Sequence, residues 1–163
     1  MAVADETAPP HEPFMRRALD CARRNLAAGA PPVGACLVRD QTVLAVAGNG
    51  VIQELDATAH AEIQVIRAAC RAERQLQLVG AELYVTVEPC AMCLAASFYA
   101  GLRRIFFGAP LAAMGDTTGQ ECGVAASVLF AGTDSAPQLA GGVLEVDSRA
   151  LLEQWAQLRE RSQ

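Results

Sequence analysis

Residues 82–93 read ELYVTVEPCAMC and join a predicted strand to the start of a predicted helix. Its first half, Glu82–Val87, is rich in β-branched and aromatic residues and predicts a buried strand. Pro89 suits the first position of a helix, and the apolar residues after it predict a helix that runs to about Ala100. Arg104–Phe107 then predicts another strand. A strand–helix–strand unit implies two parallel strands with the helix packed on the sheet.

The elements on either side of this unit continue the alternation of helices and strands, which predicts an α/β domain with helices on both faces of the sheet. Apolar spacing and turn residues set their boundaries, with Thr58 or Asp56 as the expected N-cap of the second helix and Asp147 or Ser148 as that of the last. The other predicted helices are Phe14–Ala28, Ala59–Glu73 and a last one to about Arg159, and the other predicted strands are Val33–Arg39, Val43–Ala47 (a hairpin around Asp40–Gln41) and Val143–Val146. We expect a loop at Gly48–Asp56, a loop with some helix at Leu111–Gly123, and either helix or strand at Ala125–Phe130.

Length and composition fit one globular domain. The chain has 163 residues, of which 52% are hydrophobic and 19% charged, so an intrinsically disordered chain is excluded. Residues 1–13 are polar and proline-rich, and we expect a flexible lead before a single domain at 14–163. The longest apolar runs fall short of the roughly 18 residues that a membrane span needs, and the N-terminus lacks the apolar core of a signal peptide. We therefore expect a soluble cytoplasmic protein, with no membrane partner, whose six cysteines are reduced.

The charge balance argues against a broad nucleic-acid surface. The formal net charge is −5 at pH 7, and the chain has no lysine, so its 13 basic residues are all arginine. Phosphate contacts dominate nucleic-acid affinity and require lysine or arginine. The composition therefore favours a small ligand over a nucleic acid.

Two short motifs place metal-binding side chains at the starts of two predicted helices. His60 precedes Glu62 in the sequence HAE, and Cys90 and Cys93 belong to PCAMC. One imidazole and two thiolates suit zinc, and three protein ligands leave the fourth tetrahedral position for water, as in catalytic zinc sites. Helix N-termini favour the thiolate form of cysteine. Glu62 can share this site only if its helix approaches end-on, because residues two apart on a helix face different ways.

A site of this kind predicts a hydrolytic deamination. Zinc lowers the pKa of its bound water to about 7, which makes hydroxide available at neutral pH. Glu62 is placed to accept the proton and pass it to a ring nitrogen, while the hydroxide attacks the ring carbon that bears an exocyclic amine. On the residues alone two alternatives stay open: Cys90 and Cys93 as a redox pair, and Glu62 as a first-turn glutamate that complements the helix dipole.

These motifs resemble those of the cytidine deaminase-like zinc deaminases, most closely the bacterial branch of tRNA adenosine deaminases and guanine deaminases. The matching stretches are residues 56–63 (DATAHAEI), 83–93 (LYVTVEPCAMC) and 104–109 (RIFFGA). The resemblance implies a three-layer α/β/α fold with a five-stranded mixed sheet. It also implies one Zn²⁺ per chain, with water or hydroxide as the fourth ligand, and a homodimer.

The resemblance also points to substrate-binding residues. Purine-directed members carry an asparagine near the end of the second strand, which is the place of Asn49; as a residue between two glycines, Asn49 is equally suited to a turn. Ala61 and Glu88 adjoin the metal motifs and are further candidates. Asp116 and Trp155 complete the set, although Trp155 on its leucine-rich helical face also fits the core.

The implied reaction replaces the exocyclic amine of a purine base, nucleoside or related small metabolite with a carbonyl, and an adenine-type ring is favoured. Guanine deaminase is the first alternative, because residues 113–117 (AMGDT) match the acidic segment of that branch in part. A tRNA-editing role is disfavoured by the acidic charge and by the lack of a basic residue in 110–123. Cytosine or cytidine is a further alternative. A zinc-stabilised binding protein is the non-enzymatic one, which a general base at Glu62 opposes.

Overall fold

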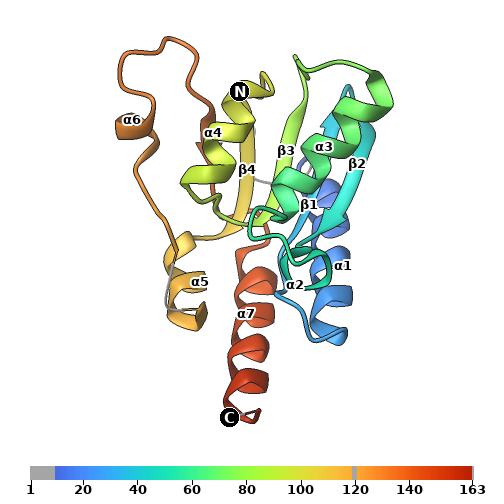
Figure 1. Ribbon diagram of the computed structural model, residues 1–163, viewed down its shortest axis with the longest axis vertical. Helices are drawn as coiled ribbons and strands as arrows, with labels where there is room; N and C mark the ends of the chain where they lie inside the picture. Colours follow the sequence, from blue (N-terminus) through green and yellow to red (C-terminus); the bar gives the residue numbers. More distant parts are fainter. Residues whose placement is uncertain (1–9, 119–120, 163) are drawn as a thin grey trace, which may run out of the picture.

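A five-stranded mixed sheet forms the centre of the computed structural model, which describes residues 10–118 and 121–162 (Figure 1). The strand order is β2-β1-β3-β4-β5. β1 pairs antiparallel with β2 and β3, whereas β3, β4 and β5 run parallel. The strands are β1 (Gly34–Arg39), β2 (Thr42–Gly48), β3 (Glu82–Val87), β4 (Arg104–Ala109) and β5 (Gln138–Ala140); the helices are α1 (Glu12–Ala27), α2 (Val51–Glu54), α3 (Ala61–Glu73), α4 (Ala91–Tyr99), α5 (Leu111–Thr118), α6 (Ala126–Leu129) and α7 (Glu145–Glu160).

The hairpin and the central strand–helix–strand unit confirm the predicted alternation. Asp40 and Gln41 both have positive φ angles, 48° and 64°, which suit the tight turn between β1 and β2. β3, α4 and β4 form the predicted parallel unit, with Leu83 opposite Ile105 in the sheet. The fold is the expected α/β domain with a mixed five-stranded sheet.

Helices cover both faces of the sheet, because alternate residues of β1, β3 and β4 point to opposite sides. On one face, α3 packs against the strands through Ala61, Val65 and Ala69, which meet Leu37, Leu83 and Val85 in one core cluster. On the other, α1 contributes Met15, Ala18, Leu19 and Ala22 to a cluster with Cys36, Val38, Tyr84 and Phe106. α1 and β1 lie so close that a Cβ added at Gly34 would stand 2.0 Å from the carbonyl oxygen of Ala18.

The last strand lies earlier in the chain than predicted. The structure forms β5 at Gln138–Ala140, and α7 begins at Glu145, so the predicted strand at Val143–Val146 is wrong. Gly142, with φ of 89°, and Leu144, with φ of 52°, turn the chain out of the sheet and into the helix. Asp147 and Ser148 therefore lie in the first turn of α7 instead of capping it.

Two helices near the metal motifs begin later than predicted. α3 begins at Ala61 with His60 as its N-cap, instead of beginning at Ala59 behind Thr58 or Asp56. α4 begins at Ala91 with Cys90 as its N-cap, so Pro89 precedes the helix. The expected loop at 48–56 contains the short helix α2, and residues 125–130 contain the helix α6.

The N-terminal helix begins earlier than predicted and includes the last residues of the expected lead. α1 starts at Glu12, and its N-cap His11 stacks on Phe106 with ring centroids 4.0 Å apart. His11 Nδ1 also lies 3.0 Å from the hydroxyl of Tyr84. Residues 1–9 of the lead lie outside the described residues. Among the described helices, none combines the length and the apolar character that crossing a bilayer requires.

Candidate active site

The N-terminal ends of α3 and α4 meet beside the carboxyl end of β3, where Val87 ends the strand (Figure 1). His60 has an extended backbone (φ −65°, ψ 155°) immediately before α3, and Cys90 has one (φ −69°, ψ 171°) immediately before α4. Cys93 lies in the first turn of α4. The helix starts therefore bring together residues that are 30 or more positions apart in the chain.

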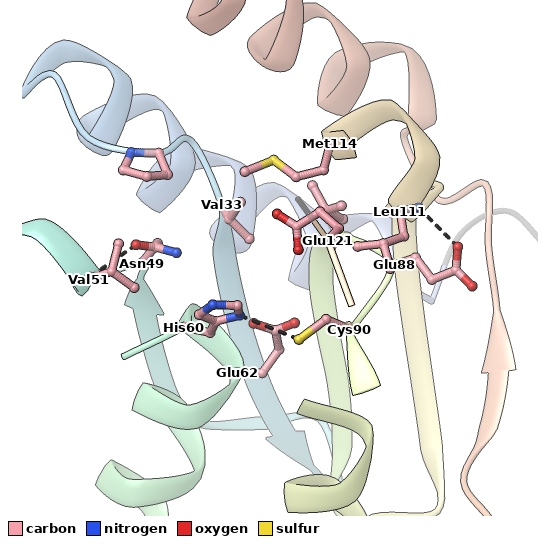
Figure 2. Close-up of a pocket in the computed structure, with 12 residues that line it drawn as sticks. Val33, Asn49, Val51, His60, Glu62, Glu88, Cys90, Leu111, Met114 and Glu121 are labelled. Atoms are coloured by element: carbon pink, nitrogen blue, oxygen red, sulfur yellow. Dashed lines mark hydrogen bonds between the residues drawn. The ribbon is translucent and has the colours of Figure 1, made fainter. Parts of the chain in front are cut away.

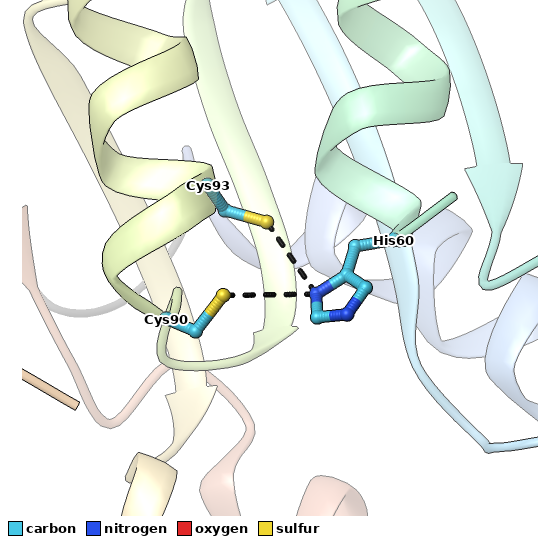
Figure 3. Close-up of side chains that lie close together, drawn as sticks. All are labelled: His60, Cys90 and Cys93. Atoms are coloured by element: carbon cyan, nitrogen blue, oxygen red, sulfur yellow. Dashed lines mark hydrogen bonds between the residues drawn. The ribbon is translucent and has the colours of Figure 1, made fainter. Parts of the chain in front are cut away.

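His60, Cys90 and Cys93 form the group that could hold a metal ion, with ligand atoms within 4.8 Å of one another (Figure 3). His60 Nδ1 lies 3.7 Å from Cys90 Sγ and 3.6 Å from Cys93 Sγ. Tetrahedral zinc, with Zn–S of ~2.3 Å and Zn–N of ~2.0 Å, requires an N···S separation of about 3.5 Å. The donor set and its spacing therefore fit zinc, with Nδ1 as the imidazole ligand.

The two thiols are coupled by a hydrogen bond. The Cys93 thiol beside Cys90 lowers the pKa of Cys90 to about 4, whereas the same hydrogen bond and burial raise the pKa of Cys93. The hydrogen bond with Cys90 also raises the pKa of His60, and the charges of Glu62 and Glu121 act in the same direction. The site thus favours the thiolate form at Cys90, and a bound cation would displace the proton of Cys93.

Glu62 occupies the first turn of α3 and is 4% exposed. Burial raises the pKa of its carboxyl group to about 7, against the opposing effect of the nearby His60. A carboxyl group with a pKa near the working pH exchanges protons in both directions, as a general acid–base catalyst must. The end-on approach of α3 satisfies the condition under which His60 and Glu62 share one site.

A cavity of about 170 Å³ opens onto these residues (Figure 2). His60, Glu62 and Cys90 form its floor, and its walls are mainly apolar. The apolar wall residues are Pro31, Val33, Val51, Val87, Leu111 and Met114. Apolar walls with a few polar groups suit a small ring.

Asn49 lines the cavity and is 8% exposed. Its side-chain Oδ1 accepts a 3.1 Å hydrogen bond from the Val51 N–H at the start of α2, and its backbone carbonyl accepts one from the Asn25 side chain. Figure 2 shows the amide nitrogen on the cavity side. The two interpretations of Asn49 therefore coexist in one side chain: Oδ1 holds the turn, and the amide faces the site.

Of the other predicted site residues, some line this cavity and others do not. Glu88 lines it, and Glu88 Oε2 accepts a 3.0 Å hydrogen bond from the Leu111 N–H. Ala61, the first residue of α3, is fully buried in the core and does not line the cavity. Trp155 is buried in α7 and borders a different hollow, with Gly29 and Leu158. Asp116 falls within α5, but its side chain lies outside the described residues.

Glu121, which was not among the predicted site residues, lines the cavity opposite Asn49 (Figure 2). The carbonyl of the next residue, Cys122, accepts a 2.9 Å hydrogen bond from the Ala91 N–H, and this contact draws the segment onto the start of α4. An acidic residue within a glycine-rich stretch was the available signal. Met114 and Val51 were missed as well, because their helices α5 and α2 were expected to be mostly loop.

The comparisons with known proteins agree with this geometry. The family model for the cytidine and deoxycytidylate deaminase zinc-binding region matches residues 9–109. A tRNA-specific adenosine deaminase of Agrobacterium fabrum is 51% identical over 96 residues, which are 59% of this chain and 63% of the relative. Guanine deaminase of Bacillus subtilis is 40% identical over 100 residues, which are 61% of this chain and 64% of the relative.

A solved structure from a study of A-to-I editing by tRNA:A34 deaminases superposes with a TM-score of 0.72. It is 41% identical to this chain, and the match covers 85% of this chain and 97% of that one. The chain spans a little less than two thirds of the length of the curated relatives described above.

Proposed function

The chain belongs to the cytidine and deoxycytidylate deaminase family, and we propose that it is a zinc-dependent hydrolytic deaminase of a small purine compound. The substrate is a purine base, nucleoside or related metabolite, with an adenine-type ring first and guanine second. The reaction replaces the exocyclic amine with a carbonyl group and releases ammonia.

The burial of Glu62 beside His60, Cys90 and Cys93 carries this proposal. A site that only stabilises the fold closes its metal with four protein ligands, and it needs no carboxyl group at a cavity. Here two of the three ligand residues, His60 and Cys90, line the same cavity as the buried carboxyl group of Glu62, and Cys93 completes the group beside them. This arrangement opposes both the redox pair and the non-enzymatic binding protein.

Each residue of the site has a part in the reaction. His60, Cys90 and Cys93 would hold zinc, which supplies a hydroxide nucleophile at neutral pH when it is bound. Glu62, with its pKa raised to about 7 by burial, accepts the proton of the attacking water and delivers it to a ring nitrogen. It then transfers a second proton, from the hydroxyl group added to the ring, to the amine, which leaves as ammonia. The apolar walls exclude water around the ring, and the Asn49 amide donates a hydrogen bond that orients it.

The preference for a purine rests on the relatives, since both curated relatives described above act by name on adenosine or guanine. The preference for a small substrate rests on charge. No lysine or arginine lines the cavity among the described residues, and the chain carries a net charge of −5. A tRNA substrate needs cationic contacts to its phosphates.

Editing of tRNA is the second candidate, because the 51% identity to a tRNA-specific adenosine deaminase favours it. This candidate requires arginines outside the cavity to supply the phosphate contacts. Arg103 and Arg104, at the start of β4, are the nearest pair to α4 in the chain.

Ammonia release by the zinc-loaded protein tests these candidates. The panel contains adenine, adenosine, guanine, guanosine, cytosine, cytidine and a tRNA with adenosine in its anticodon loop, and Glu62→Gln serves as the control. Release from a small purine, absent in the control, is the expected result. Release from tRNA alone would replace our proposal with the editing role. Zinc bound with no release from any compound would leave only the binding protein.

We also propose a homodimer in the cytoplasm. The apolar helix α4 leaves Tyr99 76% exposed and Met92 half-buried, which supports a contact with a second copy. All six cysteines are free thiols, as a reducing compartment allows. Sedimentation of the zinc-loaded protein should give twice the 17.2 kDa mass of the chain; a single species at the monomer mass would contradict the dimer.

A further inference from the structure

We propose that a second chamber beside the metal site holds the part of the substrate beyond its ring, and that this chamber accepts a neutral or cationic hydrogen-bond donor and rejects phosphate. The inference rests on the proposed function and specifies its substrate class. The substrate is then an unphosphorylated nucleoside, or a ring that bears a hydroxyl or amine substituent.

The chamber is a hollow of about 520 Å³ between α5 and the segment 121–124. It shares Glu88, Leu111 and Glu121 with the metal-site cavity, so the two spaces adjoin along one wall. Its remaining lining is small or apolar: Ala112, Gly115, Gly123 and Val124. A ring that sits over Glu62 can therefore extend a substituent past Glu88 and Glu121 into this space.

The sizes of the two spaces support a substrate larger than a free base. Pockets that hold a whole small ligand measure about 300–1,000 Å³. The metal-site cavity, at about 170 Å³, is below this range and suits the ring alone. The chamber, at about 520 Å³, is the larger space and would stay largely unused by a free base.

The charge of the shared wall determines what the chamber can accept. Glu88 and Glu121 are its only charged lining residues in the described part of the chain, and both are acidic. The nearest basic residues along the chain are Arg104 and Arg149, because 105–148 contains neither lysine nor arginine. Phosphate recognition depends on cationic groups or on helix N-terminal amides. The chamber is lined by the start of α5, but the Leu111 N–H there is already donated to Glu88, and a phosphate would be repelled by two carboxylates.

The two carboxylates also favour substrate groups that donate hydrogen bonds, because an ionised carboxylate can only accept them. Glu88 is held in place through its bond from the Leu111 N–H. The Ala91–Cys122 hydrogen bond positions the backbone next to Glu121. Hydroxyl groups of a sugar, or an amine, supply the donors that these two side chains can receive.

A matched set of adenine, adenosine and adenosine 5′-monophosphate, and the corresponding guanine set, tests the inference on the zinc-loaded full chain. We expect the nucleoside to have the highest kcat/KM, and the monophosphate to be at least about tenfold poorer through KM. Binding of the same compounds to the Glu62→Gln variant, measured by calorimetry, should give the same order without turnover. A monophosphate that is processed and bound as well as the nucleoside would overturn the inference and leave the proposed function intact. If the free base is the best substrate, the inference is likewise overturned, and the proposed function again stays intact.

Charge variants test whether the discrimination between nucleoside and monophosphate arises in the chamber. Glu121→Gln should reduce the discrimination between nucleoside and monophosphate by about tenfold. Glu153→Gln, an equal change of charge on the exposed face of α7, should leave the discrimination unchanged. Equal effects of the two variants would refute a local role of Glu121. The absence of both turnover and binding for every compound would overturn the proposed function and this inference with it.

Discussion

His60 and Glu62 stand two positions apart in the chain, and both face one cavity. This is possible because His60 precedes α3 with an extended backbone, while Glu62 lies inside the first turn. Within a regular helix the same two positions would face different sides. The helix start thus holds the proposed metal ligand and the proposed proton-transfer group in a fixed relation, and mutation can separate their roles.

Replacing Glu62 by glutamine should abolish turnover and keep the metal. The amide cannot transfer the proton, and loss of a general acid–base group typically costs about 10²–10⁴-fold in rate. Zinc content, measured by atomic absorption, should stay at one per chain, since Glu62 is not one of the three ligand residues. Because the buried carboxyl group becomes a neutral amide, the melting temperature should not fall. Near-normal turnover would refute the assigned role.

Replacing Cys93 by serine should remove the metal and destabilise the protein. Zinc bound only to the folded state stabilises it by an amount that grows with zinc concentration, so the variant should lose the zinc-dependent rise in melting temperature. Cys70→Ser is the matched control, because Cys70 lies on α3 outside the metal group. A control that loses zinc to the same extent would contradict the assignment of the site.

Asn49 can be tested in both of its roles with two variants. Asn49→Ala removes the acceptor for the Val51 N–H and the amide in the cavity, so it should lower the melting temperature and raise KM. Asn49→Asp keeps the acceptor and loses only the amide donor. It should raise KM by about tenfold, the equivalent of one hydrogen bond, while the melting temperature stays near that of the wild type. An unchanged KM in both variants would leave Asn49 as a turn residue.

The stability of the domain should fall in alkali because of Cys36. Burial raises the pKa of its thiol from 9.0 to about 12. Between these values the unfolded chain loses the proton and the folded chain keeps it, so the free energy of unfolding decreases as the pH rises above 9. Each group of this kind contributes up to about 1.4 kcal/mol per pH unit. Urea unfolding between pH 8 and pH 10 should show a shallower decrease for Cys36→Ala; equal slopes would contradict the prediction.

The contact between α1 and β1 should not tolerate a side chain at Gly34. An added methyl group would meet the Ala18 carbonyl oxygen at 2.0 Å, and neither backbone can move without disturbing the sheet. We expect Gly34→Ala to lower the free energy of unfolding by about 1–3 kcal/mol. Gly115→Ala is the control, since an added Cβ there meets nothing within 4 Å and its helical position favours alanine. Similar losses in both variants would show that the close approach is not the cause.

The parts of the fold that the sequence predicted are those with strong local signals. Glu82–Val87 and the apolar helix after it have one consistent interpretation, and Asp40–Gln41 suits a tight turn. The metal group was predictable because imidazole and thiol side chains at two helix starts have few other uses. The HAE motif pointed to Glu62 for the same reason.

The parts that were missed depend on contacts between distant segments. Gln138–Ala140 has no apolar pattern of its own and becomes a strand only because Arg104–Phe106 offers a free sheet edge. Glu121 reaches the cavity through the Ala91–Cys122 backbone contact, which no residue pattern encodes. Trp155 illustrates the converse: a large aromatic residue attracts a functional interpretation, although the fold buries it away from the cavity.

The Ala91–Cys122 hydrogen bond would link metal occupancy to the shape of the proposed chamber. Ala91 lies between the two cysteines of the metal group, and its amide bonds to the segment that forms the far wall of the chamber. Loss of the metal would loosen the first turn of α4 and, through this single bond, the wall itself. Amide hydrogen exchange at Ala91 should therefore report zinc loss and chamber opening together, as one local unfolding unit.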